Sequence, residues 1–213
     1  MENESMIQYN YMKKLLWCIL PLVLLACNSK RNIKSQYPNG MVYEDYYESK
    51  QHPGQKEGVY RVYDDKGGLI EEANYKKGLL DGKRILYYPK KRISVEENYK
   101  DGKFEGPYLE FYVNGNKKTE GQYLNGAMDG LWRYYYLNPP NKLKEAVTFS
   151  NNEENGPYEM YMPSGILSEK GTYKNGFEEG KIEIYDTLTG KLMREMIFKD
   201  SMIVTINNIQ KND

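Results

Sequence analysis

Cysteine and histidine are nearly absent from this chain of 213 residues. The two cysteines, Cys18 and Cys27, lie near the N-terminus, and His52 is the single histidine. With no thiol after Cys27, the rest of the chain offers no disulfide and no thiolate ligand, and one histidine cannot supply a zinc site. His52 stands in a Gln-His-Pro-Gly loop, and we expect it to be an exposed turn residue. We therefore expect no metal centre and no cofactor.

The chain also lacks an excess of either charge. Its 30 basic and 30 acidic residues cancel. Nucleic-acid-binding proteins carry a basic patch or stripe that neutralises phosphates. We expect no nucleic-acid partner.

The sequence shows none of the usual catalytic arrangements. It contains no serine or cysteine nucleophile with a histidine partner and no phosphate-cradling loop. Paired carboxylates such as Glu71-Glu72 and Glu96-Glu97 occur, but neighbours in a strand point to opposite faces and cannot converge on one substrate. We expect the protein not to be an enzyme.

Long apolar runs are missing except at the N-terminus. Lys13 and Lys14 precede an uncharged stretch from Leu15 to Ala26, which is too short to cross a bilayer comfortably and fits the apolar part of a secretory signal. The stretch ends in Leu-Leu-Ala-Cys and resembles the bacterial lipobox, in which the cysteine, here Cys27, is lipidated. An uncleaved anchor helix with an incidental cysteine is the alternative.

This resemblance predicts a membrane-anchored lipoprotein of the bacterial cell envelope, in the outer membrane if the bacterium is Gram-negative. We expect a signal peptide over residues 1–26, the lipidated cysteine with a flexible tether over residues 27–40, and a folded domain over residues 41–210. Met1, Met6 and Met12 are all candidate start residues, and a start at Met12 would make residues 1–11 an extension.

What the chain has in abundance is tyrosine, 22 in all, together with glycine at a fixed spacing. A segment of the form Tyr-x-x-Gly-x-x-x-Gly recurs, and self-similarity at such a period indicates a repeat protein. Most intervals between the closing glycines are 24 residues, and one, which contains the insertion Asn138-Pro-Pro-Asn141, is 26. These repeat glycines are Gly58, Gly82, Gly106, Gly130, Gly156 and Gly180.

Each unit is numbered here from its repeat glycine as position 0, and each reads as a strand, a turn and a second strand. Position +5 is always aromatic, and Asn114-Gly115 is typical of a two-residue hairpin loop. That loop places position +7 opposite +10, and the repeat glycine opposite the closing aromatic, so that Gly106 pairs with Tyr123 and Gly58 with Tyr75. An aromatic ring then covers the backbone that glycine leaves bare.

The alternation of side chains along a strand sorts each unit onto two faces. One face gathers positions 0, +2, +4, +13, +15 and +17 and should be buried. The other carries the aromatic +5 stripe among charges, with Arg61 opposite Glu72. The stripe is our candidate binding surface. The alternative is that its rings serve only to hold the sheet together. Its members are Tyr63, Tyr87, Phe111, Tyr135, Tyr161 and Tyr185.

From Gly58 to Phe198 the chain resembles bacterial MORN repeat variants, often labelled YwqK-like antitoxins. The resemblance implies an all-β fold, an elongated twisted antiparallel sheet of successive hairpins that follows the signal-peptide helix. Residues 149–152, where both the tyrosine and the first glycine of the motif are replaced, depart from the pattern, as does Arg84, and we expect local irregularity there. Residues 201–208 should form a closing strand.

The resemblance implies less about activity. We expect a lipid-anchored scaffold that binds a protein or another ligand through its repeats. A toxin neutraliser and a purely structural envelope component are the alternatives.

Overall fold

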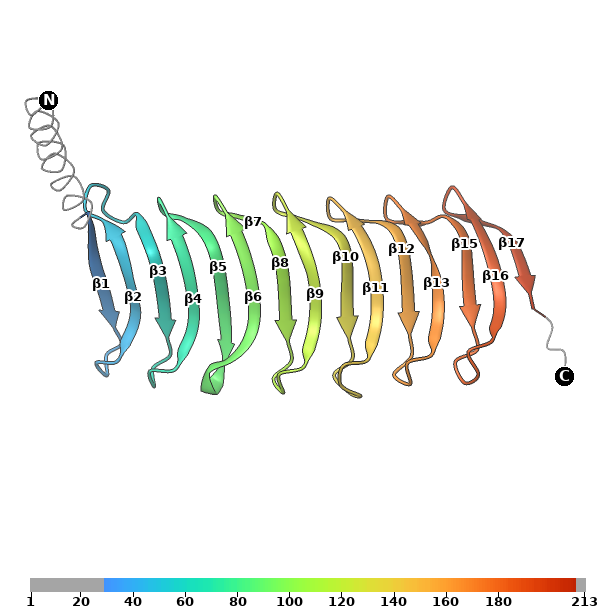
Figure 1. The fold of residues 1–213 in the computed structure, drawn as a ribbon, viewed down its shortest axis with the longest axis horizontal. Helices are drawn as coiled ribbons and strands as arrows, with labels where there is room; N and C mark the ends of the chain where they lie inside the picture. Colours follow the sequence, from blue (N-terminus) through green and yellow to red (C-terminus); the bar gives the residue numbers. More distant parts are fainter. Residues whose placement is uncertain (1–28, 210–213) are drawn as a thin grey trace, which may run out of the picture.

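The computed structural model describes residues 29–209, which form a single antiparallel sheet of 17 strands (Figure 1). This confirms the predicted fold class for that part of the chain; the predicted signal helix and Cys27 lie outside the described residues. Among residues 29–209, no helix is long and apolar enough to cross a membrane.

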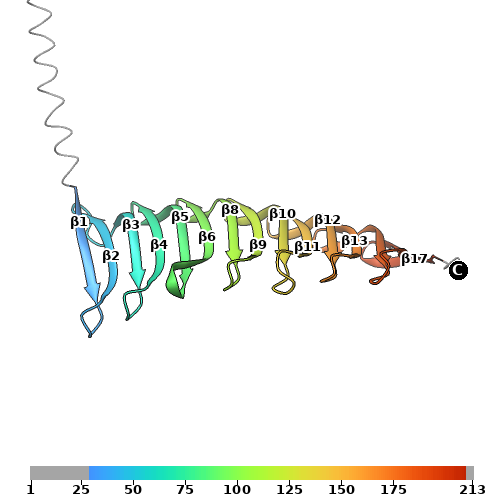
Figure 2. The ribbon, with the colours of Figure 1, turned by 60° about the horizontal axis from the view of Figure 1, so that its bottom comes forward.

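Neighbouring strands in the sheet follow the order of the chain, so β1 and β17 form the two free edges (Figure 1). The strands are β1 (Lys30–Gln36), β2 (Val42–Ser49), β3 (Lys56–Tyr63), β4 (Leu69–Lys76), β5 (Leu79–Tyr88), β6 (Arg92–Lys100), β7 (Lys103–Phe104), β8 (Gly106–Phe111), β9 (Lys117–Leu124), β10 (Ala127–Tyr135), β11 (Leu143–Ser150), β12 (Glu153–Tyr161), β13 (Leu167–Lys174), β14 (Phe177–Glu178), β15 (Gly180–Tyr185), β16 (Leu192–Lys199) and β17 (Met202–Asn208), with a 3-10 turn η1 (Pro89–Lys91) before β6. The sheet stays a single layer and twists along its length (Figure 2).

The register within each unit is the predicted one from position 0 to position +4. Gly58 pairs with Tyr75 and Gly106 with Tyr123, and the other four repeat glycines pair with Tyr99, Phe149, Tyr173 and Phe198. All six repeat glycines have positive φ, which L-residues rarely adopt. The recurrence of glycine with a closing aromatic is therefore explained by folding.

The predicted two-residue loop at Asn114-Gly115 is wrong. Phe111 pairs with Lys117, the N–H of Gly115 donates to the carbonyl of Tyr112, and the N–H of Tyr112 donates to the carbonyl of Asn116. Val113 and Asn114 are thus the central residues of the turn, and Gly115 follows with a φ of 88° as a bulge. This shifts the register by one residue at position +5 and leaves positions 0 to +4 as predicted.

Two-residue loops occur instead between the units. Asn125 and Gly126 both have positive φ, and Leu124 pairs directly with Ala127. This is the type I′ geometry that matches the twist of antiparallel strands. The same turn forms at residues 77–78, 101–102, 151–152, 175–176 and 200–201.

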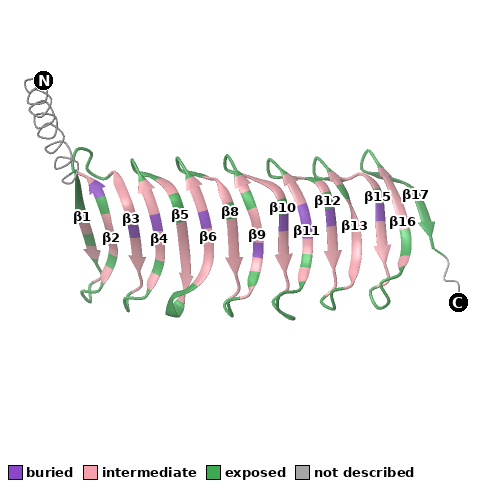
Figure 3. Cartoon of the chain, viewed as in Figure 1, coloured by how far each residue is buried: buried purple, intermediate pink, exposed green. Residues whose placement is uncertain are grey.

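The face predicted to be buried carries most of the small core and is called the ring face below. Trp132, Val147, Tyr158 and Ile182 form one buried cluster, with further rings packed against it. Tyr123 contacts Tyr108, Phe104 and Trp132, with centroids 4.6 to 5.8 Å apart. Most buried residues lie in a band at mid-strand, with Glu48 at the end of β2 as an exception, while the turns and β17 are largely exposed (Figure 3).

Three local predictions are corrected by the structure. Residues 30–36, expected to belong to a flexible tether, form strand β1, which pairs with β2 along its whole length. The sequence Phe149-Ser-Asn-Asn causes no irregularity, because Asn151 and Asn152 adopt the positive φ values of the usual turn. Strand β5 runs straight through Arg84, whose guanidinium contacts Glu71 at 2.7 Å and Glu97 at 3.0 Å. Burial disfavours the charged guanidinium, but these hydrogen bonds outweigh it and raise the Arg84 pKa.

Candidate functional site

The face opposite the ring face, called the stripe face here, carries the six aromatic residues at position +5. All six are half-buried. Beside them runs an unbroken row of directly paired residues from β3 to β16, one from each strand except the short β7 and β14. In order the row is Arg61, Glu72, Ile85, Glu96, Leu109, Glu120, Arg133, Ala146, Glu159, Lys170, Glu183 and Glu195.

Three stripe tyrosines donate hydrogen bonds to carboxylates of this row. Tyr135 donates to Glu120 at 2.5 Å, Tyr161 to Glu159 at 2.6 Å and Tyr185 to Glu183 at 2.6 Å. Burial together with the neighbouring carboxylate raises the pKa of Tyr135 to about 12, and the bond to Glu159 with burial does the same for Tyr161. These hydroxyls are therefore protonated and oriented at neutral pH. The hydrogen bonds hold the tyrosine rings in place, so that the rings offer a fixed apolar surface.

The C-terminal part of the row is held by ion pairs. Glu183 lies 2.7 Å from Lys170 and 2.5 Å from Lys181. Hydrogen bonds from Lys170, Lys181 and Tyr185 lower the pKa of Glu183 to about 2. The predicted pair Arg61–Glu72 forms at 2.7 Å in the first unit.

The row contains one small residue, Ala146. This residue occupies the place held by Glu72, Glu96 and Glu120 in earlier units, and its cross-strand partners are Arg133 and Glu159. A cavity of about 510 Å³ lies over this part of the row. Leu131, Leu143 and Pro157 line it with apolar surface, and Arg133, Glu159 and Lys170 supply charge.

Arg133 is the least firmly paired cation of the cavity. Its nearest carboxylate oxygen belongs to Glu120, at 3.9 Å, and 43% of its side chain is exposed. In the first unit the equivalent Arg61 has Glu72 directly opposite at 2.7 Å. Arg133 thus faces an alanine where Arg61 faces a carboxylate, so it presents hydrogen-bond donors to the cavity.

A second set of tyrosines, at position +6, joins consecutive units. Tyr88 donates to the carbonyl of Phe111 at 3.1 Å, Tyr112 to that of Tyr135 at 2.7 Å and Tyr136 to that of Tyr161 at 2.8 Å. Tyr37 makes the same bond to Tyr63 at 2.9 Å. Each bond ends on a stripe residue, so these tyrosines fix the spacing of the stripe. They were not predicted from the sequence, although Tyr88, Tyr112 and Tyr136 each directly follow a +5 aromatic, which was a usable signal.

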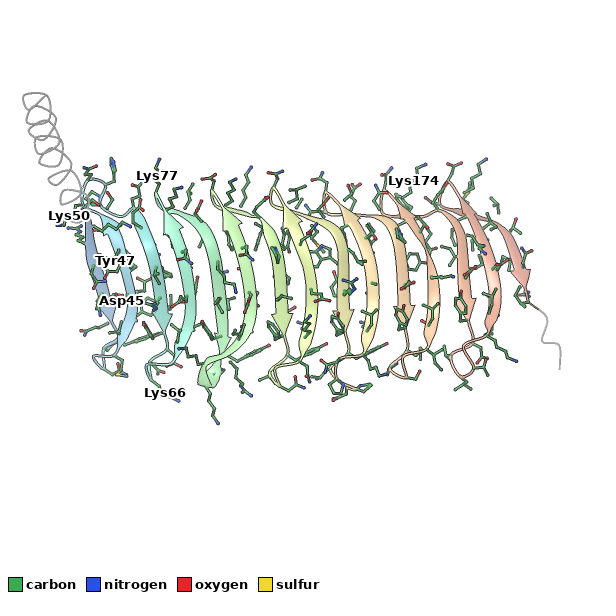
Figure 4. The ribbon with its side chains drawn as sticks, viewed as in Figure 1. Asp45, Tyr47, Lys50, Lys66, Lys77 and Lys174 are labelled. Carbon is green, nitrogen blue, oxygen red and sulfur yellow. The ribbon has the colours of Figure 1, made fainter. Side chains whose placement is uncertain are left out.

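The two long margins of the sheet differ in the turns they carry. Lys77 and Lys174 lie at the margin formed by the turns between units, and Lys66 lies at the opposite margin, formed by the turns within units (Figure 4). No cluster of three or more metal-binding side chains occurs within residues 29–209. Cys27, the predicted lipidation site, lies outside the described residues.

Comparison with known protein families identifies two units of the sheet as copies of a known repeat. Residues 56–77 and 154–175 match the model of the MORN repeat variant. Comparison with curated proteins gives no match. Each matched segment contains one strand–turn–strand unit, β3–β4 in one case and β12–β13 in the other. In its first and fifth units, and in the open sheet that they help to build, the chain is similar to MORN repeat variant proteins.

Proposed function

We propose that this protein is a lipid-anchored component of the bacterial cell envelope that binds a protein segment on its stripe face. The observation that carries the proposal is the cavity over Ala146, which combines apolar surface with the exposed guanidinium of Arg133. Apolar hollows with a few convergent polar groups are the usual form of a binding site. MORN repeats in an extended sheet are consistent with such a scaffold.

The groups around the cavity favour a particular kind of ligand. Leu131, Leu143 and Pro157 suit an apolar side chain, and the exposed Arg133 suits a carboxylate placed beside it. Tyr135 and Tyr161 lie on the same strands as Arg133 and Glu159, and aromatic side chains with arginine are enriched at protein interfaces. We therefore propose as ligand an extended segment with an apolar residue next to an acidic one.

Filling the cavity tests this proposal. Ala146→Glu introduces the residue type that earlier units carry at this position, so the fold has room for it. The new carboxylate should pair with Arg133 as Glu72 pairs with Arg61. We expect pull-downs from envelope extract with full-length Ala146→Glu protein to lose a partner that wild type retains.

Leu188→Glu is the matched control, because it adds the same charge in a turn where Leu188 is 87% exposed. Circular dichroism should show unchanged strand content for both variants. Equal capture of partners by wild type and a folded Ala146→Glu variant would refute binding at this cavity.

The lipid anchor rests on the sequence Leu-Leu-Ala-Cys that ends at Cys27, and it has its own test. Cells given radiolabelled palmitate should label the wild type and should not label Cys27→Ala. Label on the variant, or none on the wild type, would contradict lipidation.

Two alternatives make different predictions in the same pull-down. A purely structural envelope component would capture no partner with any variant. An antitoxin-like neutraliser would capture one small toxic protein whose gene lies beside this one.

A further inference from the structure

The last strand, β17, is an open edge of a kind that β-proteins usually protect. It pairs only with β16. All seven of its residues are exposed, and none is charged (Figure 3). Its apolar residues are Met202, Ile203, Val204 and Ile206, between 50% and 66% exposed. Exposed, uncharged edge strands invite pairing with another chain.

The opposite edge is built differently. Strand β1 carries Lys30, Arg31 and Lys34, and Ile33 is its single aliphatic residue. Arg31 pairs with Glu48, and Lys34 lies 3.1 Å from Asp45. Lysine and arginine are the residues with which sheet edges are normally kept from associating. Because β1 carries charges that prevent association and β17 does not, β17 is the edge that we expect to pair with another strand.

The backbone of β17 has N–H and C=O groups that are free to pair with another strand. The N–H of Ile209 donates to the carbonyl of Met193, and Asn207 pairs with Glu195. Because hydrogen-bonded and non-hydrogen-bonded pairs alternate along an antiparallel ladder, the N–H and C=O groups of Ile206 and Asn208 point away from β16. The ring face also ends here, since Ile203 and Ile206 pair with Phe198 and Met196, which pack against the core.

We propose that β17 pairs with β17 of a second copy of this chain, antiparallel and about a two-fold axis perpendicular to the sheet. Such an axis keeps the ring face of both copies on the same side. Pairing centred on Thr205 sets Val204 of each copy opposite Ile206 of the other, and aliphatic cross-strand pairs are favourable. It also leaves no charge unpaired, because β17 has none.

Head-to-tail pairing of β17 with β1 is less well matched. It would place the uncharged aliphatic strand against three cations, and it would leave a free edge at each end for indefinite growth. The two-fold pairing closes with two copies. Its contact is one strand wide, so we expect a dimer that dissociates in the micromolar range.

Sedimentation of the full-length protein in detergent tests the proposal. Wild type should shift from one to two copies across the micromolar range. Ile206→Lys should stay monomeric throughout, while Leu188→Lys, with the same charge in an exposed turn, should dimerise as wild type does. Because Ile206 is 53% exposed, the variant should keep its fold, which circular dichroism checks.

Cross-linking distinguishes the two geometries. Thr205→Cys should form one disulfide-linked dimer under mild oxidation, beyond any cross-link that wild type gives through Cys18 or Cys27. Monomeric wild type at all micromolar concentrations, or a ladder of higher oligomers, would overturn the two-fold pairing. Dimerisation of Ile206→Lys to the same extent as wild type would also overturn it.

Discussion

At the scale of single residues, two positions need glycine because a neighbouring side chain leaves no room for a Cβ, and not because of their backbone conformation. Gly121 and Gly171 have ordinary φ values, unlike the repeat glycines. A Cβ on Gly121 would overlap the indole of Trp132, and one on Gly171 would overlap Ile182. Both stand at position +15, which Ala73 holds in the first unit. The size of this residue is therefore matched to the +2 side chain of the next unit.

Gly121→Ala should lower the free energy of unfolding by about 1 to 3 kcal/mol, as is usual for an added methyl group in a packed core. Chemical denaturation measures the loss. The same substitution made together with Trp132→Leu should cost less than it does alone, because the smaller side chain makes room. Strictly additive effects would show that contact with Trp132 is not the cause.

The ion pairs of Glu183 predict a dependence of stability on acid. Its pKa of about 2 in the folded protein lies below the ordinary glutamate value of about 4.3, so the stabilisation is complete above that value and is lost as the pH falls towards 2. Glu183→Gln should therefore be less stable than wild type at pH 7, by about 1 kcal/mol or less for a surface pair.

Denaturation at several pH values between about 5 and 2 checks this, and the variant's stability should fall less steeply than that of wild type. Glu153→Gln, at an exposed position, is the control. Parallel curves for wild type and Glu183→Gln would contradict the role given to this carboxylate.

At the scale of strands and turns, three tyrosines at position +6, Tyr88, Tyr112 and Tyr136, each connect one unit to the next through a hydrogen bond. Tyr112→Phe and Tyr136→Phe remove a hydroxyl without changing the ring, and each should cost about 1 kcal/mol in denaturation experiments. Tyr47→Phe, at a side chain that is 47% exposed, should cost much less. Equal losses at all three positions would argue against ties between units.

The sequence predicted the repeated elements well because each is decided locally. A glycine with positive φ and the ring that covers it lie in the same hairpin, so Gly106 and Tyr123 could be paired without the structure. The turn at Asn114-Gly115 was misassigned because it looks like Asn125-Gly126 in sequence, although the first lies in a bulged turn and the second in a two-residue loop.

Strand β1 and the cavity over Ala146 could not be predicted in this way. Residues 30–36 lack alternating apolar residues, since β1 is an edge strand held by pairs such as Lys34–Asp45. The cavity is lined by residues of five strands, β10, β11, β12, β13 and β15, so no single segment of the sequence shows it. Aligning the units at position +14, with allowance for the insertion at residues 138–141, would have revealed Ala146 among the glutamates.

At the scale of the whole molecule, the sheet is a series of nearly equivalent units whose contacts are with their neighbours. Deleting residues 106–129 removes one full period and joins Glu105 to Gly130, which restores the pattern of the turn between units. The shortened protein should stay folded and lose two strands, or about 10 Å of length. Circular dichroism and small-angle X-ray scattering check both expectations.

Deleting residues 106–117 provides the control. It removes half a period and one strand. To remain antiparallel, all later strands would have to turn over together, which puts their ring face on the opposite side of the sheet from that of the earlier units. That protein should aggregate. If the half-period deletion folded as well as the full-period one, the units would not be the building blocks of the sheet.

The pairing of each repeat glycine with its closing aromatic also has an evolutionary consequence. Because every unit begins and ends with the same geometry, a gene that gains or loses one period by unequal recombination still encodes a continuous sheet with both faces in place. The length of such a protein is then inherited separately from its surface chemistry. Selection can adjust the reach of the molecule in one mutational event and refine a binding surface such as that around Ala146 in others.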